Sequence, residues 1–411
     1  MKISPSKLGL LGTLYFVQGM PYGFQAGALA AYARSHGMSL KAIGFLSALY
    51  LPWLLKPLWA PLVERYGSER IGARKSWILP MQAGIALACL TASFFPGREN
   101  ILPLLGLVFL MNLFAATQDI AVDGLAVDLL HGEGLGWGNA VQVVGYKLGS
   151  LTGGGLLIWA SEYIGWRGIF IAMAVLAAAG MAITLAAHEP PRAASGGAVR
   201  MEWREIFGRM KSAMLLPGAG WMLLFIGTYK LGESLSDALY KAFLVDSGFT
   251  LVQVGKWSGT WGTVASLSGS ILGGLLATRI PLLGAVFVTA TLRVFPLLGR
   301  WVLALAVPTQ EAIIGVTLAE EFFGGALTTA MFAFMMSRVD RRIGAAHYTL
   351  LAGIELLGKM PAGPVAGILA DDAGWSYAQV FLLGTVLSVA FLLLLIPLRQ
   401  PRPPASPPAT P

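Results

Sequence analysis

LLGLVFLMNLFAATQDIAVDGLAVDLL, residues 104–130, is apolar along most of its length, yet it carries Asp119 and Asp123 four residues apart and Asp128 shortly after them. The stretch is longer than the roughly 20 apolar residues that a helix needs to cross a lipid bilayer. A charge at the centre of such a helix costs about 2.5–3.5 kcal/mol on insertion scales. These carboxylates therefore need a cationic partner, a wet cavity or a functional role.

The rest of the chain has the composition of a membrane protein. Of its 411 residues, 56% are hydrophobic and 12% are charged, about half the charged share of an ordinary soluble domain. Hydropathy predicts an all-α integral membrane protein with twelve transmembrane helices. The predicted spans are 8–33, 40–62, 76–95, 101–130, 138–161, 165–187, 217–245, 251–278, 281–307, 310–337, 345–370 and 375–398.

The charges in the loops orient these spans. One side of the predicted membrane collects most of the basic residues, in clusters at 65–75, 200–211 and 338–342. The loops of the other side hold Arg34, Lys41, Arg98 and Arg167. Because basic loops resist translocation, we expect both termini to be cytoplasmic and the protein to be a multi-pass component of the inner (plasma) membrane. The net charge of +8 then suits anionic lipid headgroups, and no nucleic-acid partner is expected.

A long internal connection divides the spans into two groups of six. We expect an N-terminal six-helix bundle at 1–187, a cytoplasmic linker at 188–216, a C-terminal six-helix bundle at 217–398 and a disordered Pro-rich tail at 399–411. Two such halves are typical of an alternating-access transporter with its substrate site at the midplane between them. We expect it to act as a monomer.

The second half of the linker has the pattern of an amphipathic helix. In MEWREIFGRMK, residues 201–211, helical spacing puts Trp203, Phe207 and Met210 on one face and basic residues on the other. This arrangement favours a helix lying along the membrane surface.

Polar residues near the middle of spans one and five share faces of their helices. Gln18, Tyr22 and Gln25 are spaced i, i+4, i+7 in span one. In span five, glycines repeat every four residues from Gly145. This repeat favours close helix packing. The candidate substrate-binding residues are Gln18, Tyr22, Gln25, Gln142, Tyr146, Lys147, Tyr229 and Lys230.

Span seven carries three ionisable groups on one helical face, Lys230, Glu233 and Asp237, at i, i+3, i+7. Such a face is hard to bury unless it meets water or a ligand. A carboxyl group in a medium of low dielectric favours its protonated form and can carry a proton. The candidate proton-coupling residues are therefore Asp119, Asp123, Glu233 and Asp237.

Other membrane-depth charges favour structural roles. Lys147 is the nearest cation in the sequence for Asp119 and Asp123, whereas Lys56 is expected to snorkel or to neutralise a nearby acid. Glu355 and Lys359, at i, i+4, predict an intrahelical ion pair. Glu320 and Glu321 are adjacent and must lie on different faces, and Asp128 is expected at the membrane interface.

Several segments of the chain resemble known transporters. WAPLVERYGSERIGARKSW, residues 59–77, resembles the loop between spans two and three of the major facilitator superfamily, with Ala60 and Glu64 in place of its usual Gly and Asp. The resemblance implies a cytoplasmic latch that holds the halves together by charge pairing. The latch residues are Glu64, Arg65, Arg74 and Lys75.

TQDIAVDG, TYKLGESLSDALYKAFLVDSGF and LLGKMPAGPVAGILADDAGWS narrow the likeness to the branch of the AmpG muropeptide permeases and the acetyl-CoA transporters. The resemblance implies proton-driven or exchange transport of a bulky anionic solute. An anhydro-muropeptide taken up with protons is the first expectation, and acetyl-CoA or a related anionic metabolite is the alternative.

Two other classes of protein can be compared with these features, an intramembrane enzyme and a channel or sensor. An intramembrane aspartyl protease needs aspartates on two helices, whereas Asp119 and Asp123 share one. The scattered histidines have no metal-ligand spacing, and the chain has no phosphate-binding loop. We therefore expect no enzyme activity, no metal and no cofactor. A channel or a sensor built on the same fold is the remaining alternative interpretation of the sequence.

Overall fold

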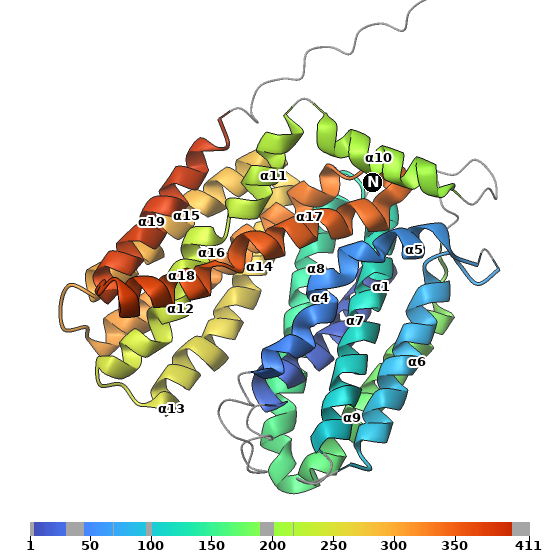
Figure 1. Ribbon diagram of the computed structural model, residues 1–411, viewed down its shortest axis with the longest axis horizontal. Coiled ribbons are helices and arrows are strands. Elements are labelled where there is room, and N and C mark those ends of the chain that lie inside the picture. The colour runs from blue at the N-terminus through green and yellow to red at the C-terminus, as the bar shows by residue number, and fades with distance from the viewer. Residues whose placement is uncertain are drawn as a thin grey trace, which may run out of the picture.

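The computed structural model describes residues 4–29, 45–68, 70–95, 101–189, 201–216 and 218–396. In this part of the chain the architecture is helical, and the helices form two bundles that lie side by side (Figure 1). The predicted tail at 399–411 and the first part of the linker, 190–200, lie outside the described residues.

The N-terminal half contains six helical runs. They are α1 (Pro5–Gly23) with η1 (Phe24–Ala28); η2 (Phe45–Tyr50), α4 (Leu51–Leu55), η3 (Lys56–Leu58) and α5 (Ala60–Arg65); α6 (Lys75–Ala92); α7 (Ile101–Leu129); α8 (Gly134–Leu151) with η5 (Thr152–Leu156); and α9 (Leu157–Ala186). Within α9, Gly165 has a φ of +65° and makes a kink. This kink falls between predicted spans five and six.

The linker contains α10 (Trp203–Leu215), and the C-terminal half repeats the pattern of six runs. They are α11 (Ala219–Thr228) and α12 (Leu231–Asp246); α13 (Leu251–Val254), η6 (Gly255–Trp261) and α14 (Gly262–Arg279); α15 (Leu282–Leu303); α16 (Gln310–Ser337); η7 (Arg341–Ile343), α17 (Gly344–Lys359), α18 (Ala362–Gly367) and η8 (Ile368–Asp372); and α19 (Tyr377–Leu393). Every predicted span thus corresponds to one helix or one interrupted helical run within the described residues.

Interruptions distinguish most of these runs from a simple spanning helix. In the described residues, length and apolarity alone identify Ile101–Leu129, Trp159–Ala186 and Leu282–Leu303 as able to cross a membrane, and two bent helix pairs would raise the total to 5. Span two shows the cause, since Pro52, Pro57 and Pro61 each remove a backbone donor and break the regular ladder. Irregular backbone at membrane depth is tolerated where it lines a cavity or is buried in protein.

Small residues let α1 and α8 approach each other closely. A Cβ atom added at Gly149 would lie 2.1 Å from the carbonyl oxygen of Phe16, and one added at Gly153 would lie 2.1 Å from that of Met20. Side chains at these positions would separate the two helices. The predicted packing face of span five, which also includes Gly145, is confirmed, and α1 is its partner.

Replacing Gly149 with Val should prevent stable folding. The new Cβ would collide with backbone, so no rotation of a side chain can relieve the clash. We expect the variant to lose its monodisperse peak in size-exclusion chromatography in detergent. Gly9→Val on α1 is the matched control, because no atom lies within 4 Å of a Cβ placed there. A Gly149→Val protein with the peak and thermal stability of the wild type would contradict the packing described above.

The two halves share one apolar core at the end of the molecule that carries the N-terminus and α10, which we call the closed end. Its buried residues come from both halves and include Leu125, Val127, Met335 and Ala345. Away from the closed end each half has separate apolar clusters. The helices diverge in that direction (Figure 1), so the halves are packed together at one end and apart at the other.

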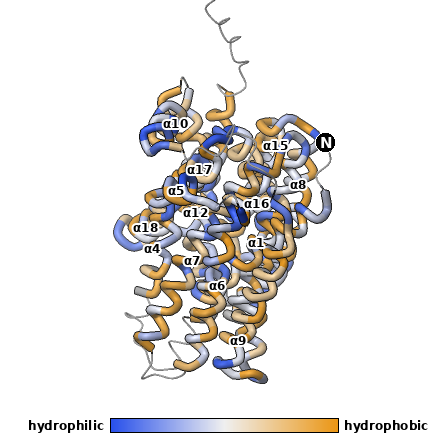
Figure 2. Tube along the Cα trace, turned by 90° about the vertical axis from the view of Figure 1, so that its right-hand side faces the viewer, coloured by the Kyte–Doolittle hydropathy of each residue, from blue (hydrophilic) through white to orange (hydrophobic). Residues whose placement is uncertain are grey.

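Hydrophobic residues make up much of the length of the helices, as a lipid environment requires (Figure 2). Hydrophilic residues gather on α10 at the closed end and in the interior near α12 and α16 (Figure 2). The interior polar groups belong to the candidate site.

Candidate functional site

A cavity of about 1,280 Å³ lies between the two halves. Its lining includes side chains from α1, α4, α7 and α8 of the N-terminal half and from α12, α14, α16 and α17 of the C-terminal half. Ligand pockets are usually about 300–1,000 Å³. The cavity is therefore large enough for a bulky solute, and it occupies the position expected for the substrate site of a two-bundle transporter.

Asp119 and Asp123 both line this cavity, although they are only 6% and 2% exposed. The uninterrupted α7 places them one helical turn apart. Lys56 forms an ion pair with Asp119, which also accepts a hydrogen bond from the Gln18 side chain. Asp119 is thus held by one cation and one neutral donor.

Asp123 is held by neutral donors. The Tyr15 hydroxyl donates to its Oδ1 at 2.8 Å, and Gln142 Nε2 donates to the same oxygen at 3.4 Å. Among the described residues, Asp123 has no cation within ion-pair distance. Lys56 therefore faces two buried carboxylates, and one added proton would bring this cluster to neutrality. We call Lys56, Asp119 and Asp123 the carboxylate cluster.

The expectation that Lys147 would pair with Asp119 or Asp123 was wrong. Lys147 instead reaches across the cavity to the Ser266 hydroxyl on α14. The expectation that Lys56 neutralises an acid was right, because the proline-broken span two turns its side chain inward. Lys147 was expected to be the partner because it is close to Asp119 and Asp123 in the sequence. The break in the backbone of span two instead brings Lys56 to Asp119.

Five of the eight candidate substrate-binding residues line the cavity. They are Tyr22, Gln142, Tyr146, Lys147 and Lys230.

Gln18, Gln25 and Tyr229 do not line the cavity. Gln18 is fully buried against Asp119. Gln25 donates to the carbonyl oxygen of Leu46 at 3.2 Å, and the Tyr229 hydroxyl donates to Glu355 at 3.2 Å. Helical spacing placed these residues near the correct face, but it could not show which of them a neighbouring helix covers.

The polar groups of span seven do not share one environment. Tyr229 and Lys230 form a turn between α11 and α12, and Lys230 is the N-cap residue of α12. Lys230 lines the cavity, whereas Glu233 and Asp237 do not. The three groups therefore do not line one cavity, although the Asp237 side chain is 46% exposed.

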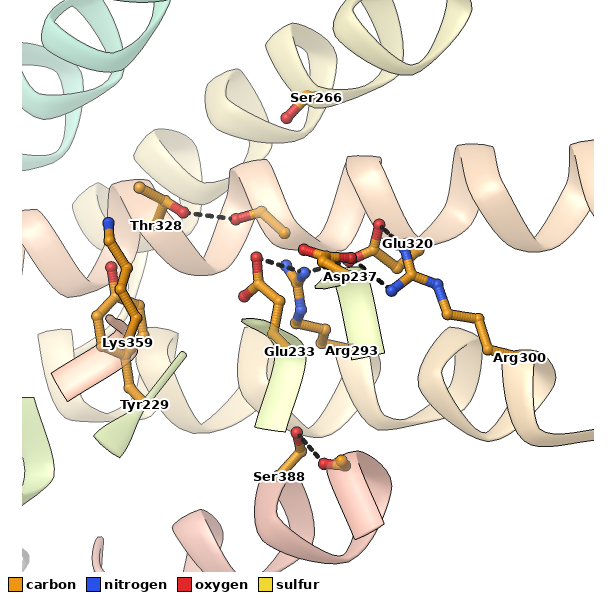
Figure 3. A network of polar contacts seen from close by, with 12 residues as sticks. Tyr229, Glu233, Asp237, Ser266, Arg293, Arg300, Glu320, Thr328, Lys359 and Ser388 are labelled. Atoms are coloured by element: carbon orange, nitrogen blue, oxygen red, sulfur yellow. Dashed lines mark hydrogen bonds and ion pairs between the residues drawn. The ribbon is translucent and has the colours of Figure 1, made fainter. Parts of the chain in front are cut away.

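Glu233 and Asp237 belong to an ion-pair network with residues of α15 and α16 (Figure 3), in which Asp237 is exposed and the other members are largely buried. Arg293 contacts Glu233 at 2.8 Å and also contacts Glu320, and Arg300 contacts Glu320 at 2.7 Å. Arg300 also contacts Asp237 at 2.5 Å. These five residues, which we call the arginine network, tie three helices of the C-terminal half together.

Three acidic oxygens of the arginine network, from Glu233, Asp237 and Glu320, lie within 4.8 Å of one another. A metal ion would normally suit such a set, but Arg293 and Arg300 already supply two positive charges to it. The guanidinium groups already occupy the carboxylate oxygens that would bind the ion, and at contact distance they would repel it. The residues present do not fit a metal ion.

Sequence reasoning missed Tyr15 and Arg300. A signal existed for both, because Tyr15 precedes Gln18 by three residues and Arg300 follows Arg293 by seven, spacings that share a helical face. The predicted separation of the two neighbouring glutamates was right, since Glu320 is in the arginine network and Glu321 lines the cavity.

The cavity wall carries a surplus of positive charge on the C-terminal side. Lys230, Lys241 and Lys359 line it, and Lys147 faces them from α8. Glu355 forms the i, i+4 ion pair with Lys359 at 3.0 Å, as their spacing predicts. Lysines at membrane depth in a wet cavity suit anionic groups of a solute.

At the closed end, Glu64 connects the two halves. Its Oε2 accepts hydrogen bonds from the backbone amides of Ala345 at 2.7 Å and Ala346 at 3.2 Å, in the first turn of α17. A carboxylate at a helix N-terminus satisfies unpaired amides and interacts favourably with the helix dipole. Arg74 contacts Glu64 at 3.2 Å and Asp128 at 3.1 Å. Glu64 in place of the usual Asp therefore still joins the halves.

The other two predicted latch residues do not bridge the halves. Arg65 lies over the ring of Trp203 at 4.9 Å, and Lys75 donates to the carbonyl oxygens of Leu185 and Ala187. Trp203 begins α10, so Arg65 fastens the linker helix to the N-terminal half.

The linker helix α10 packs on the protein around Ile206, and its position along the membrane surface stays a prediction. Ile206 is fully buried and Met210 packs against the shared core, whereas Phe207 is exposed. Arg209 contacts Asp340 of the C-terminal half at 3.5 Å. The spacing placed Trp203, Phe207 and Met210 together, but contact with the bundles centres on Ile206.

Comparisons with known proteins agree with this geometry. The family described as "Acetyl-coenzyme A transporter 1" matches residues 7–158. The chain is 31% identical over 399 residues to the anhydromuropeptide permease of Escherichia coli (strain K12), covering 95% of this chain and 79% of the permease. It is 24% identical over 389 residues to "Putative transporter AmpG 4" of Rickettsia conorii, covering 93% and 94%.

Among solved structures, the transporter FucP in the outward conformation superposes with a TM-score of 0.74 at 13% identity, covering 96% of this chain and 99% of FucP. That likeness shows the fold, and it confirms the predicted all-α fold with two six-helix bundles. Together with the sequence relatives it excludes an enzyme. The chain is a multi-pass membrane transporter that belongs to the AmpG and acetyl-CoA transporter family of the major facilitator superfamily.

Proposed function

We propose that this protein is a proton-coupled symporter that takes up a bulky anionic solute by alternating access. The observation that carries the proposal is a cavity between the halves with lysines on its wall and the carboxylate cluster beside them. The positive charge of the lysines would attract an anionic solute, and the carboxylate without a cationic partner would accept the proton.

Coupling would arise from the charge of the carboxylate cluster. With Lys56 and both aspartates ionised, the cluster keeps one negative charge in a largely buried site. A proton on Asp123 removes this charge and makes closure of the cavity around the site less costly, because burial of an uncompensated charge is avoided. Release of the proton on the other side would restore the charge and complete the cycle.

The arginine network would serve mainly as structure. This network also has one more carboxylate than it has cations, but each of its carboxylates contacts an arginine, whereas Asp123 contacts no cation among the described residues. Of the four candidate proton-coupling residues, we therefore assign the proton to Asp119 and Asp123 and a positioning role to Glu233 and Asp237.

The basic loops at the closed end support an orientation with that end and both termini in the cytoplasm. The cavity then opens to the outside, where an incoming solute would bind. A single chain encloses the whole cavity, so we propose that the protein acts as a monomer in the inner membrane.

An anhydro-muropeptide is the first candidate cargo, because the 31% identical relative is named for that substrate. Acetyl-CoA is the second, because the matching family over residues 7–158 is described as a transporter of it. Both compounds carry negative groups that suit Lys147 and Lys230.

Uptake into liposomes tests the proposal. Purified protein would be reconstituted with an imposed inward proton gradient and offered radiolabelled anhydro-muropeptide and acetyl-CoA in parallel, with protein-free liposomes as the control. We expect accumulation of one compound that disappears when the gradient is collapsed. Accumulation of neither compound would contradict the proposed cargo, and uptake that ignores the gradient would contradict the coupling.

A further inference from the structure

Four aromatic side chains form one continuous group on the N-terminal side of the cavity. Tyr22 lies 5.1 Å from Tyr50, 6.3 Å from Trp53 and 5.4 Å from Tyr146, between ring centroids. Trp53 and Tyr146 are 6.1 Å apart. All four line the cavity. We call these four residues the aromatic corner.

The aromatic corner is more than a packed part of the core. Its residues come from three separate helical runs, α1, η2 with α4, and α8, and their side chains meet at the cavity. Its three tyrosines are partly exposed, and Trp53 donates through Nε1 to Asn112 at 2.9 Å, which fixes its ring. Partly exposed, rigid aromatic rings in a pocket are suited to contact a ligand.

The angles between the rings indicate the shape of that ligand. Tyr22 is inclined by 75° to Tyr50 and by 84° to Trp53, and Trp53 by 85° to Tyr146. A flat base such as adenine is best held between parallel faces, and none of these ring pairs is parallel. A corner of nearly perpendicular rings instead offers one face for contact, with hydroxyl groups at its edges.

A pyranose ring matches these features. It has an apolar C–H face that can lie on one aromatic ring, and hydroxyl and amide groups at its rim that can bond to tyrosine hydroxyls. Lys56 lies 5.5 Å from the centroid of the Trp53 ring, but it is paired with Asp119. The lysines Lys230, Lys241 and Lys359 come from the other half. The cavity is thus divided into an aromatic wall and a cationic wall.

We propose that Tyr22, Tyr50, Trp53 and Tyr146 form a binding subsite for a pyranose ring of the transported solute, while the lysines bind its anionic groups. This inference deepens the proposed function and rests on it for the anionic part of the cargo. It favours a glycan-bearing anion over a nucleotide thioester. Binding at the aromatic corner needs no proton gradient, so it can be tested separately from coupling.

Titration calorimetry on the purified protein in detergent tests the subsite with three probes. They are N-acetylglucosaminyl-anhydro-N-acetylmuramic acid without peptide, the same disaccharide carrying its tripeptide, and the free tripeptide. Tyr50→Leu should weaken binding of both sugar-containing probes about tenfold, or about 1.4 kcal/mol, and leave the free tripeptide unchanged. Tyr146→Leu should act in the same way, so a folding defect in one variant does not remove the test.

Two controls identify the cause of the effect. Tyr50→Phe keeps the ring and should bind the sugar-containing probes within about threefold of the wild type. Leu58→Ala changes an exposed side chain of the same helical run that does not line the cavity and should leave all three affinities unchanged.

The other outcomes are as informative. Equal loss for all three probes, or no loss, would overturn the subsite, as would a wild-type protein that binds no sugar-containing probe. Selective loss in a protein that shows no proton-driven uptake would support the subsite and overturn the proposed coupling. The two proposals can therefore fail separately.

Discussion

Replacing Asp123 with Asn should abolish proton-driven accumulation of the solute while leaving its exchange across the membrane intact. Asn has the shape of Asp and can still accept the hydrogen bond from Tyr15, but it is permanently neutral. The carboxylate cluster then behaves as if always protonated, so the cavity can close and reopen without a proton. Exchange survives, and the link to the gradient is lost.

The size of the effect follows from the gradient. With the membrane potential clamped at zero, a gradient of one pH unit supplies about 1.4 kcal/mol per proton, so one proton can support about tenfold accumulation. We expect the wild type to approach a tenfold ratio of inside to outside concentration. We expect the Asp123→Asn variant to reach a ratio of about one. Counterflow of labelled substrate should remain within about threefold of the wild-type rate.

A matched control is available in Asp246→Asn. Asp246 ends α12 and accepts a hydrogen bond from Tyr377, and it does not line the cavity. This variant should accumulate substrate as the wild type does. Accumulation by Asp123→Asn at the wild-type ratio would assign the proton to another group, and loss of counterflow as well would indicate a structural role.

Replacing Arg74 with Gln should open the closed end. Arg74 is 1% exposed and faces both Glu64 and Asp128. Removing one member of a buried ion pair costs about 3–5 kcal/mol. Glu64 also bonds to the first turn of α17, so this cost falls mainly on the conformation in which the halves are packed at this end. The outward-open population should therefore fall.

Labelling of an engineered cysteine measures this shift. Thr260 is exposed and lines the cavity, so Thr260→Cys should react with a membrane-impermeant maleimide when the cavity is open. The native Cys89 is fully buried and gives little background. We expect Arg74→Gln to slow labelling at least tenfold, because a shift of about 3–5 kcal/mol exceeds that factor.

Arg70→Gln removes an exposed charge from the same loop and should leave the labelling rate unchanged. The double variant Glu64→Gln, Arg74→Gln should recover part of the rate, because it removes the negative charge that Arg74 balanced. An unchanged labelling rate in Arg74→Gln, with the protein still monodisperse, would show that the latch does not hold the closed end.

Much of the architecture follows from the sequence because the bilayer imposes simple requirements. Each apolar segment had to become a helix, and the long polar linker had to separate two bundles. The glycine row from Gly145 to Gly153 also predicted close packing, which α1 supplies. The membrane side of each loop stays a prediction from its charges.

The candidate site was harder to predict, since it depends on where helices break. Glu233 and Asp237 pair with arginines of α15, whereas Lys230 lines the cavity. The prolines of span two brought Lys56 to Asp119. A regular helical repeat cannot show either arrangement. The aromatic corner could not be predicted from the sequence either, because Tyr50 and Trp53 contact Tyr22 only after their helical runs are packed together.

The most direct measurement of the central claim is the movement of protons with the solute. Liposomes that contain the protein and a trapped pH-sensitive dye would start with equal pH on both sides and the membrane potential clamped at zero. Addition of anhydro-muropeptide outside should acidify the interior of wild-type liposomes and leave those with Asp123→Asn unchanged. Uptake of labelled anhydro-muropeptide by the wild type with no change in internal pH would contradict proton symport through the carboxylate cluster.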